Sequence, residues 1–177
     1  MSGLDEIRRG RAWVVGDSID TNQLAGGGLS GATPEETLRI NCLRVVRPDF
    51  PDEVRLGDLV VAGRNFGCGS SRQTAVEALV LCGVAGVVVE SVARIFRRNC
   101  IAYGLPLFVV PGAVTAVEDG DQITLDYAQR RLSVARSGTA LPVMPWSSGV
   151  EEIYAGGGLA KVITARLSAN GYPPDVT

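Results

Sequence analysis

The centre of the chain alternates short apolar runs with segments whose apolar residues recur at helical spacing. A continuous apolar run of this kind is typical of a strand that is buried on both faces. The order strand, helix, strand, helix, strand predicts parallel neighbouring strands joined by right-handed crossovers. The expected strands cover residues 59–62, 84–90 and 105–110, and the helices between them cover 73–81 and the segment from Ser91 to Gly104.

The second of these helices is expected to be amphipathic. Ser91 has a side chain suited to cap its start, and Gly104 is suited to end it. Helical spacing directs one set of side chains toward the core and another toward water, where a contact with another subunit is an alternative. The core-facing set is Val92, Ile95, Phe96 and Ile101, and the water-facing set is Arg94, Arg97 and Arg98.

The two ends of the chain predict further elements around this parallel core. Residues 12–15 predict a short strand, and Thr33 followed by Pro34 is typical of the start of a helix, here one that ends near residues 43–46. The C-terminal part predicts an antiparallel hairpin (122–126 and 131–135), a helical turn (149–154) and a last helix (159–167). No repeat or internal boundary is visible. We therefore expect one α/β domain over residues 1–177, with a mixed, partly parallel sheet flanked by helices and a C-terminal hairpin.

Composition narrows the class of protein. The chain has 177 residues, of which 46% are hydrophobic and 20% are charged, a balance typical of a soluble globular domain. The formal net charge of −2 argues against a nucleic-acid partner. No apolar run approaches the roughly 20 residues of a membrane span, and the first residues lack the layout of a secretion signal. We therefore expect a cytoplasmic protein with neither nucleic-acid nor membrane partners.

Histidine is absent from the sequence, and this absence excludes several chemistries within the chain. It removes Ser–His and Cys–His catalysis, and without close cysteine pairs it also removes most zinc sites. We therefore expect no metal bound by this chain. Cys42, Cys82 and Cys100 are expected to be small buried residues, whereas Cys68 either faces a substrate or packs beneath its loop.

The strongest chemical signal is the loop at residues 63–72, Gly-Arg-Asn-Phe-Gly-Cys-Gly-Ser-Ser-Arg, between an expected strand and an expected helix. Its glycines permit sharp turns and leave the backbone uncovered. Ser70 or Ser71 is suited to cap the helix, whose first amides have no internal acceptor. Arg72 adds a guanidinium that suits a carboxylate or a phosphate. The loop therefore predicts an anion pocket with two hydroxyl groups. A nucleotide is a weaker candidate, because the loop lacks Gly-x-x-x-x-Gly-Lys.

A second polar segment follows the first expected strand. Residues 16–23, Gly-Asp-Ser-Ile-Asp-Thr-Asn-Gln, are rich in side-chain acceptors. Within them, Thr21 and Asn22 either shape an Asx turn or contribute to a site. Residues 24–31 then contain four glycines, so this segment is flexible unless a ligand or a partner orders it.

Three segments together resemble the small subunits of isopropylmalate isomerase, which are swivelling domains of the aconitase superfamily. They are the turn at 16–23, the loop at 63–72, and Ser-Val-Ala-Arg-Ile-Phe-Arg-Arg-Asn at 91–99 with Gly-Leu-Pro-Leu at 104–107. Order and spacing agree with the family over roughly residues 11–168. The resemblance implies a swivelling β/β/α domain and a hydro-lyase or isomerase that acts on a hydroxylated di- or tricarboxylate, as in leucine biosynthesis.

The resemblance also implies a partner and roles for individual residues. A large subunit, joined in a heterodimer or heterotetramer, would hold a [4Fe–4S] cluster, and this chain would bind no cofactor itself. Ser70 would be the general base, and Ser71 and Arg72 would bind the carboxylates of the small substrate. Thr21 and Asn22 fall in the family's active-site shell, and Ser30 falls at the position that helps to select the substrate.

Several positions depart from the family pattern. The family usually has Asp at the position of Asn22 and Glu-His at Gln73 and Thr74, and the segment at 24–31 lacks the usual Pro and Tyr-Leu pair. These departures favour a paralogous hydro-lyase for another substituted malate over ordinary leucine biosynthesis. The other alternative is a non-catalytic carboxylate-binding or regulatory subunit, against which the intact Ser-Ser-Arg at 70–72 argues.

Overall fold

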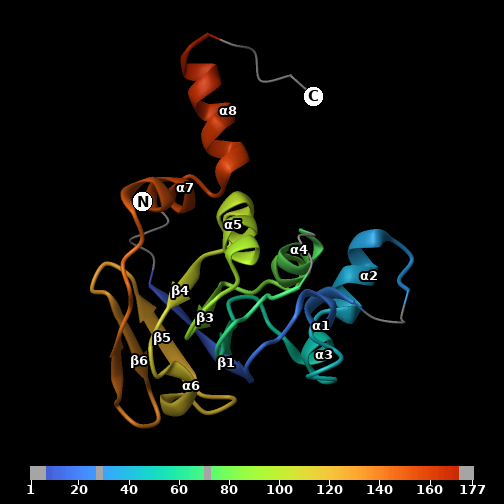
Figure 1. Ribbon diagram of the computed structural model, residues 1–177, viewed down its shortest axis with the longest axis vertical. Coiled ribbons are helices and arrows are strands. Elements are labelled where there is room, and N and C mark those ends of the chain that lie inside the picture. The colour runs from blue at the N-terminus through green and yellow to red at the C-terminus, as the bar shows by residue number, and fades with distance from the viewer. Residues whose placement is uncertain (1–6, 27–29, 70–72, 172–177) are drawn as a thin grey trace.

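The computed structural model describes residues 7–26, 30–69 and 73–171. A seven-stranded mixed sheet runs through the molecule in the order β4-β3-β2-β1-β5-β6-β7 (Figure 1). β1 to β4 are parallel, and β5 to β7 continue the sheet as an antiparallel meander. The strands are β1 (Arg8–Val15), β2 (Leu59–Ala62), β3 (Gly86–Val89), β4 (Leu107–Val109), β5 (Gln122–Asp126), β6 (Arg131–Val134) and β7 (Ala140–Pro142). The predicted α/β class, parallel core and C-terminal hairpin are confirmed.

β1 joins the two halves of the sheet. Its first half, from Arg8 to Arg11, pairs antiparallel with β5, and its second half, from Ala12 to Val15, pairs parallel with β2. The sequence predicted only the second half, because three arginines and a glycine in the first half interrupt the apolar pattern. β7 was also missed, because three residues are too few to show an alternation.

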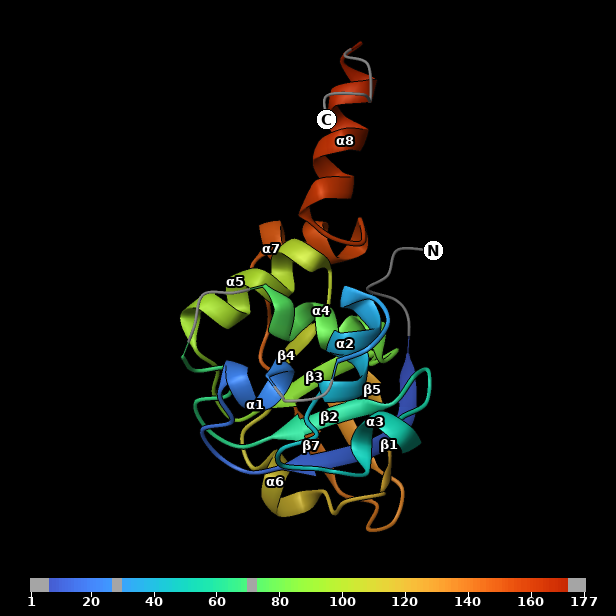
Figure 2. The ribbon, with the colours of Figure 1, turned by 90° about the vertical axis from the view of Figure 1, so that its right-hand side faces the viewer.

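Two apolar clusters lie on the two faces of the sheet. Val60 and Ala62 belong to the cluster formed with helices α1 to α5, whereas Leu59 and Val61 belong to the cluster formed with β5 and β6. β2 is therefore buried on both faces, which explains its unbroken apolar sequence. Figure 2 shows α2, α4 and α5 on one side of the parallel strands and α6 on the other. The helices are α1 (Thr21–Ala25), α2 (Pro34–Asn41), α3 (Phe50–Glu53), α4 (Thr74–Leu81), α5 (Arg94–Tyr103), α6 (Ala113–Ala116), α7 (Ser148–Ala155) and α8 (Leu159–Ala169).

Two details predicted for α5 are wrong. The helix begins at Arg94 with Ala93 at the N-cap position, so Ser91 does not cap it. Ile95 was expected in the core, but 43% of its surface is exposed. Phe96 is buried and the three arginines face outward, as predicted, and Gly104 ends the helix in the left-handed conformation. Val92 and Ile101, the other two predicted core residues, are half-buried.

The C-terminal helix α8 stands away from the body of the molecule (Figures 1 and 2). The sequence predicted a helix at 159–167, and the structure confirms it, but no residue of α8 is buried. The predicted turn at 149–154 is the longer helix α7. Within the described ranges, every helix is too short or too polar to cross a lipid bilayer.

A buried carboxylate fixes the start of β2 against β1. Asp58 is 5% exposed, and its Oδ2 accepts hydrogen bonds from Trp13 Nε1 at 2.9 Å and from the Arg55 amide at 3.0 Å. We expect Asp58→Ala to lower the free energy of unfolding by about 2 kcal/mol, because it leaves the buried indole N–H without its acceptor. Urea denaturation monitored by tryptophan fluorescence measures this loss.

Asp52→Ala is the matched control for this prediction. Asp52 is likewise an aspartate with a side-chain partner, because it forms an ion pair with Arg44 at 3.2 Å. Its side chain, however, is 70% exposed. Its loss is expected to cost about 0.5 kcal/mol or less, because solvent screens such pairs. Equal losses in the two variants would show that the indole hydrogen bond is not what makes Asp58 important.

Candidate functional site

The three segments of the family resemblance follow three neighbouring parallel strands. Residues 16–20 follow β1, residues 63–69 follow β2, and residues 90–93 follow β3. The carboxyl ends of parallel strands meet at one edge of a sheet, which is where open α/β sheets bind their ligands. The topology therefore brings the three segments together at one place.

Backbone hydrogen bonds join the loop after β2 to the segment after β1. The Asp17 carboxylate also accepts a hydrogen bond from the Arg64 amide at 2.7 Å. An isolated parallel bridge between Asp20 and Cys68 extends the pairing beyond the strands. The backbone bonds run from Ser18 N to Arg64 O (2.7 Å), from Gly67 N to Ile19 O (2.8 Å) and from Thr21 N to Cys68 O (2.9 Å).

The segment after β3 holds the other side of the same loop. Ser91 Oγ accepts a hydrogen bond from the Asn65 amide at 2.8 Å, and Ser91 O accepts one from the Phe66 amide at 3.1 Å. The Ala93 amide in turn donates to Phe66 O at 2.9 Å. Ser91 therefore caps the glycine-rich loop rather than α5, which explains why the helix prediction failed at this residue.

An aromatic pair anchors the underside of the loop. Phe66 is buried and meets Phe96 of α5 edge to face, with ring centroids 5.3 Å apart. Gly67 crosses directly over Phe96 with a φ of +73°, and a Cβ on Gly67 would lie 2.2 Å from Phe96 Cγ. Only glycine fits both the left-handed backbone and the lack of space. Packing thus anchors the loop as far as Gly67, three residues before Ser70.

Three predicted site residues lie outside the described residues. They are Ser70, the predicted general base, and Ser71 and Arg72, which were predicted to bind the substrate carboxylates. The chain reaches them through Gly69, which is exposed, and continues after them with Gln73 at the N-cap position of α4. The Gln73 side chain makes no capping hydrogen bond. The described part of the loop therefore ends at the surface, one residue before Ser70.

Thr21 and Asn22 lie beside the end of this loop, in the first turn of α1. Thr21 is 7% exposed, and a Cβ on Gly69 would lie 3.2 Å from Thr21 Oγ1. Asn22 is exposed and lines a cavity of about 430 Å³. Asp20, rather than Asn22, forms the turn, because its Oδ1 accepts from the amides of Asn22 and Gln23 at 2.8 and 2.9 Å. Ser30, the predicted selectivity residue, is exposed and precedes α2.

A second cavity lies on the opposite side of the loop and was not predicted. It has a volume of about 340 Å³, and Gly67 and Gly69 form part of its wall. Arg94 and Arg98, which are one turn apart on α5, form another part. The sequence analysis predicted that these arginines lie on the solvent-exposed face of a helix. Their spacing of four residues within the third motif was the signal that they could share a cavity.

The cysteines are distributed as structural residues. Cys42, Cys82 and Cys100 are buried, as predicted, and burial raises the pKa of the Cys100 thiol well above its usual value. Cys68 is half-buried, and its thiol donates to Ser18 O at 3.6 Å, which favours packing beneath the loop. Among the described residues, no three side chains of His, Cys, Asp or Glu gather closely enough to hold a metal ion.

Known proteins with similar sequences and folds place these features in a family. Residues 47–110 match the aconitase C-terminal domain. The small subunit 1 of 3-isopropylmalate dehydratase from Methanopyrus kandleri is 43% identical over 90% of this chain and 94% of its own. The methanogen homoaconitase small subunit from Methanothermobacter thermautotrophicus is 37% identical over 88% of this chain and 90% of its own.

A solved structure agrees with the computed one over nearly the whole chain. The crystal structure of 3-isopropylmalate dehydratase from Methanocaldococcus jannaschii superimposes with a TM-score of 0.87 at 33% identity, covering 94% of this chain and 98% of the other. Fold, motifs and sequence identity therefore agree. The chain belongs to the family of 3-isopropylmalate dehydratase small subunits, within the aconitase superfamily of hydro-lyases.

Proposed function

We propose that this chain is the small subunit of a two-subunit hydro-lyase that dehydrates and rehydrates a hydroxylated di- or tricarboxylate of the isopropylmalate type. The observation that carries the proposal is the convergence of three loops at the carboxyl edge of β1, β2 and β3, which brings Gly69, the residue before the Ser-Ser-Arg segment, to the surface beside Thr21. We expect an enzyme that acts on such small carboxylic acids to be located in the cytoplasm.

Ser70 is the general base of the proposed reaction. Its oxygen would take the proton from the carbon beside a substrate carboxylate and return it in the reverse direction. A serine hydroxyl is a poor base at its ordinary pKa, so the site must stabilise the alkoxide. The guanidinium of Arg72 and uncovered loop amides would supply that stabilisation.

The other residues of the site bind and orient the substrate. Ser71 and Arg72 would hold its carboxylates through charge-assisted hydrogen bonds. Thr21 and Asn22 would approach the substrate from α1, and Ser30 would contact its variable substituent. An amide at position 22 removes a negative charge that the family usually has there, which suits a substrate with a further anionic group.

The iron–sulfur cluster of the family does not fit this chain. The described residues include no cluster of metal-ligating side chains, and Cys42, Cys82 and Cys100 are buried in the core. We therefore assign the [4Fe–4S] cluster to a large partner subunit, joined to this chain in a heterodimer or heterotetramer. The small subunit then supplies the general base and the residues that bind the substrate carboxylates.

A substrate panel tests the proposal. The purified chain is mixed anaerobically with its large subunit, and isopropylmalate, citramalate, homocitrate and other substituted malates are assayed for alkene formation. We expect turnover of at least one of them only when both subunits are present. Because a homoaconitase small subunit is among the relatives, homocitrate is the informative competitor of isopropylmalate. Assembly without turnover of any of these acids would favour a regulatory subunit instead.

A further inference from the structure

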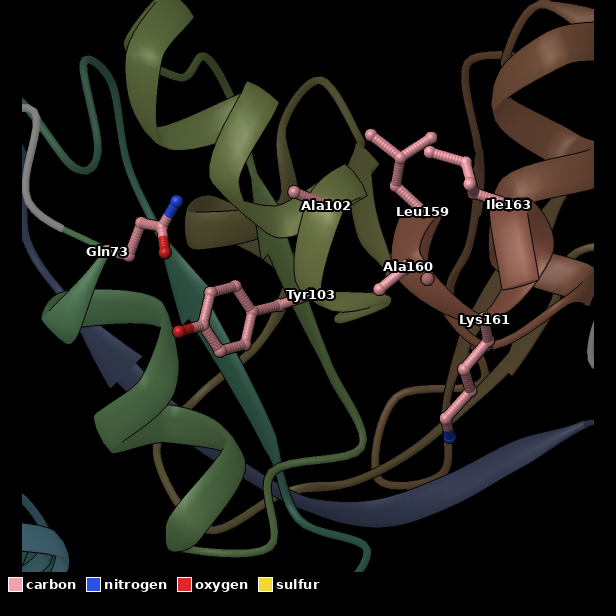
Figure 3. Close-up of a pocket in the computed structure, with 9 residues that line it drawn as sticks. Gln73, Ala102, Tyr103, Leu159, Ala160, Lys161 and Ile163 are labelled. Carbon is pink, nitrogen blue, oxygen red and sulfur yellow. The ribbon is translucent and has the colours of Figure 1, made fainter. Parts of the chain in front are cut away.

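Three cavities follow one another along α5, from the glycine-rich loop to α8. The first is the cavity of about 340 Å³ beside Gly69. It shares Ile95 and Arg98 with a second cavity of about 500 Å³, which shares Gln73, Ala102 and Leu159 with a third of about 540 Å³. Together they form one surface, which we call the α5–α8 groove. Figure 3 shows its far end, where Tyr103 lies on one side and Leu159 and Ile163 lie next to each other on the other.

The helix at the far end of the groove leaves its apolar face exposed. α8 has 11 residues, and none of them is buried. Leu159, Ile163 and Leu167, spaced one turn apart on one face, are 39%, 47% and 41% exposed. A helix of this length is marginal in water unless its apolar face is covered. The apolar stripe on α8 formed by these three residues therefore indicates a contact with another protein chain.

The charges of the groove indicate the kind of occupant. Arg94, Arg98 and Lys161 line it, and none of the described lining residues is acidic. These three side chains form no ion pair with another described residue, whereas Arg47 and Arg130 are paired with carboxylates. The surface therefore suits a partner that presents apolar side chains among acidic ones.

We propose that the α5–α8 groove docks the large subunit, an inference that rests on the proposed function. The large subunit must approach the loop that carries Ser70, and Gly69, its neighbour in the chain, lines one end of the groove. A second copy of this chain fits less well, because a two-fold contact would bring the same basic surface against itself. The large subunit would therefore extend from the catalytic loop along α5 and cover the stripe on α8.

Ile163→Glu tests the groove, with Ala165→Glu as its matched control. Both positions are exposed on α8, and helical geometry puts them on opposite faces. We expect Ile163→Glu to raise the Kd for the purified large subunit at least tenfold, measured by isothermal titration calorimetry, and Ala165→Glu to leave it unchanged. Circular dichroism checks that both variants fold.

A second pair of variants tests the charge of the groove. Arg98 lines it and Arg97 does not, although both are exposed on α5. Arg98→Gln should weaken binding of the large subunit and reduce its dependence on salt, and Arg97→Gln should do neither.

The outcomes separate this inference from the proposed function. If the wild-type chain binds no large subunit, the proposed function itself fails. If the wild-type chain binds and Ile163→Glu binds equally well, only the docking site is wrong. The docking site is also wrong if Ile163→Glu abolishes self-association, seen by sedimentation velocity, while its affinity for the large subunit stays unchanged.

Discussion

Ser70→Ala is expected to lower kcat of the reconstituted two-subunit enzyme by about 10³-fold or more, while the two subunits still assemble. The expected loss follows from the role of a general base, which typically contributes 10²- to 10⁴-fold to a rate. Removal of one hydroxyl leaves Ser71, Arg72 and the α1 residues to bind substrate, so KM should change little. Initial rates of alkene formation over a range of substrate concentrations measure both constants.

Ser148→Ala controls for loss of a serine hydroxyl elsewhere. Ser148 is exposed at the start of α7, remote in sequence from the three site segments. The Ser148→Ala enzyme should retain the wild-type kcat and KM. A Ser70→Ala enzyme that turns over within a few-fold of the wild-type rate would show that another group removes the proton.

Gly67→Ala is expected to lower the free energy of unfolding by about 3 kcal/mol and to displace the glycine-rich loop. The new methyl group would lie 2.2 Å from Phe96 Cγ and 2.5 Å from Phe96 Cβ, so rotation of the Phe96 ring cannot relieve the overlap. The left-handed backbone at this position adds its own cost. Urea denaturation gives the loss of stability, and the assay of the assembled enzyme gives the loss of activity.

Gly120→Ala separates the cost of the left-handed backbone from the cost of the overlap with Phe96. Gly120 has a φ of +84°, but a Cβ there would meet nothing within 4 Å. Its replacement should therefore cost about 1 kcal/mol, which is the backbone term alone, and leave activity intact. If Gly67→Ala cost no more than Gly120→Ala, the close approach of the loop to Phe96 would not be a determinant of stability.

The parallel core could be predicted because its strands are buried on both faces. Residues such as Val60 and Val61 face different clusters, so the sequence carries an unbroken apolar run. The first half of β1 and the whole of β7 lack such runs. Their places are set by pairing with β5 and β6, which no local pattern reveals.

The site could be predicted in part. Strand order alone brings the segments after β1, β2 and β3 to one edge, and the family resemblance selected the same segments. The bonds that fix the loop were not predictable, because Asp17 and Ser91 act on amides 47 and 26 residues away in the chain. A side chain that caps a distant loop has the same local sequence as one that caps a helix, which is why Ser91 was misassigned.

The prediction that Ile95 is buried failed for a different reason from the one that applies to Ser91. Helical spacing identifies an apolar residue but does not say whether it packs against its own chain or against another one. Ile95 lies in the α5–α8 groove, where the proposed partner would cover it together with Leu159 and Ile163. An apolar side chain that the helical pattern predicts as buried, and that is exposed in the single chain, is what a subunit covered by a partner is expected to show.

The rate of alkene formation from isopropylmalate and from homocitrate, measured anaerobically for this chain alone, for the cluster-bearing large subunit alone and for their mixture, tests the central claim most directly. The account predicts turnover of at least one of these acids by the mixture and by neither subunit alone, with the rate rising as this chain is added until the subunits are equimolar. Turnover by the large subunit alone at the rate of the mixture would contradict it, because the base would then not lie on this chain.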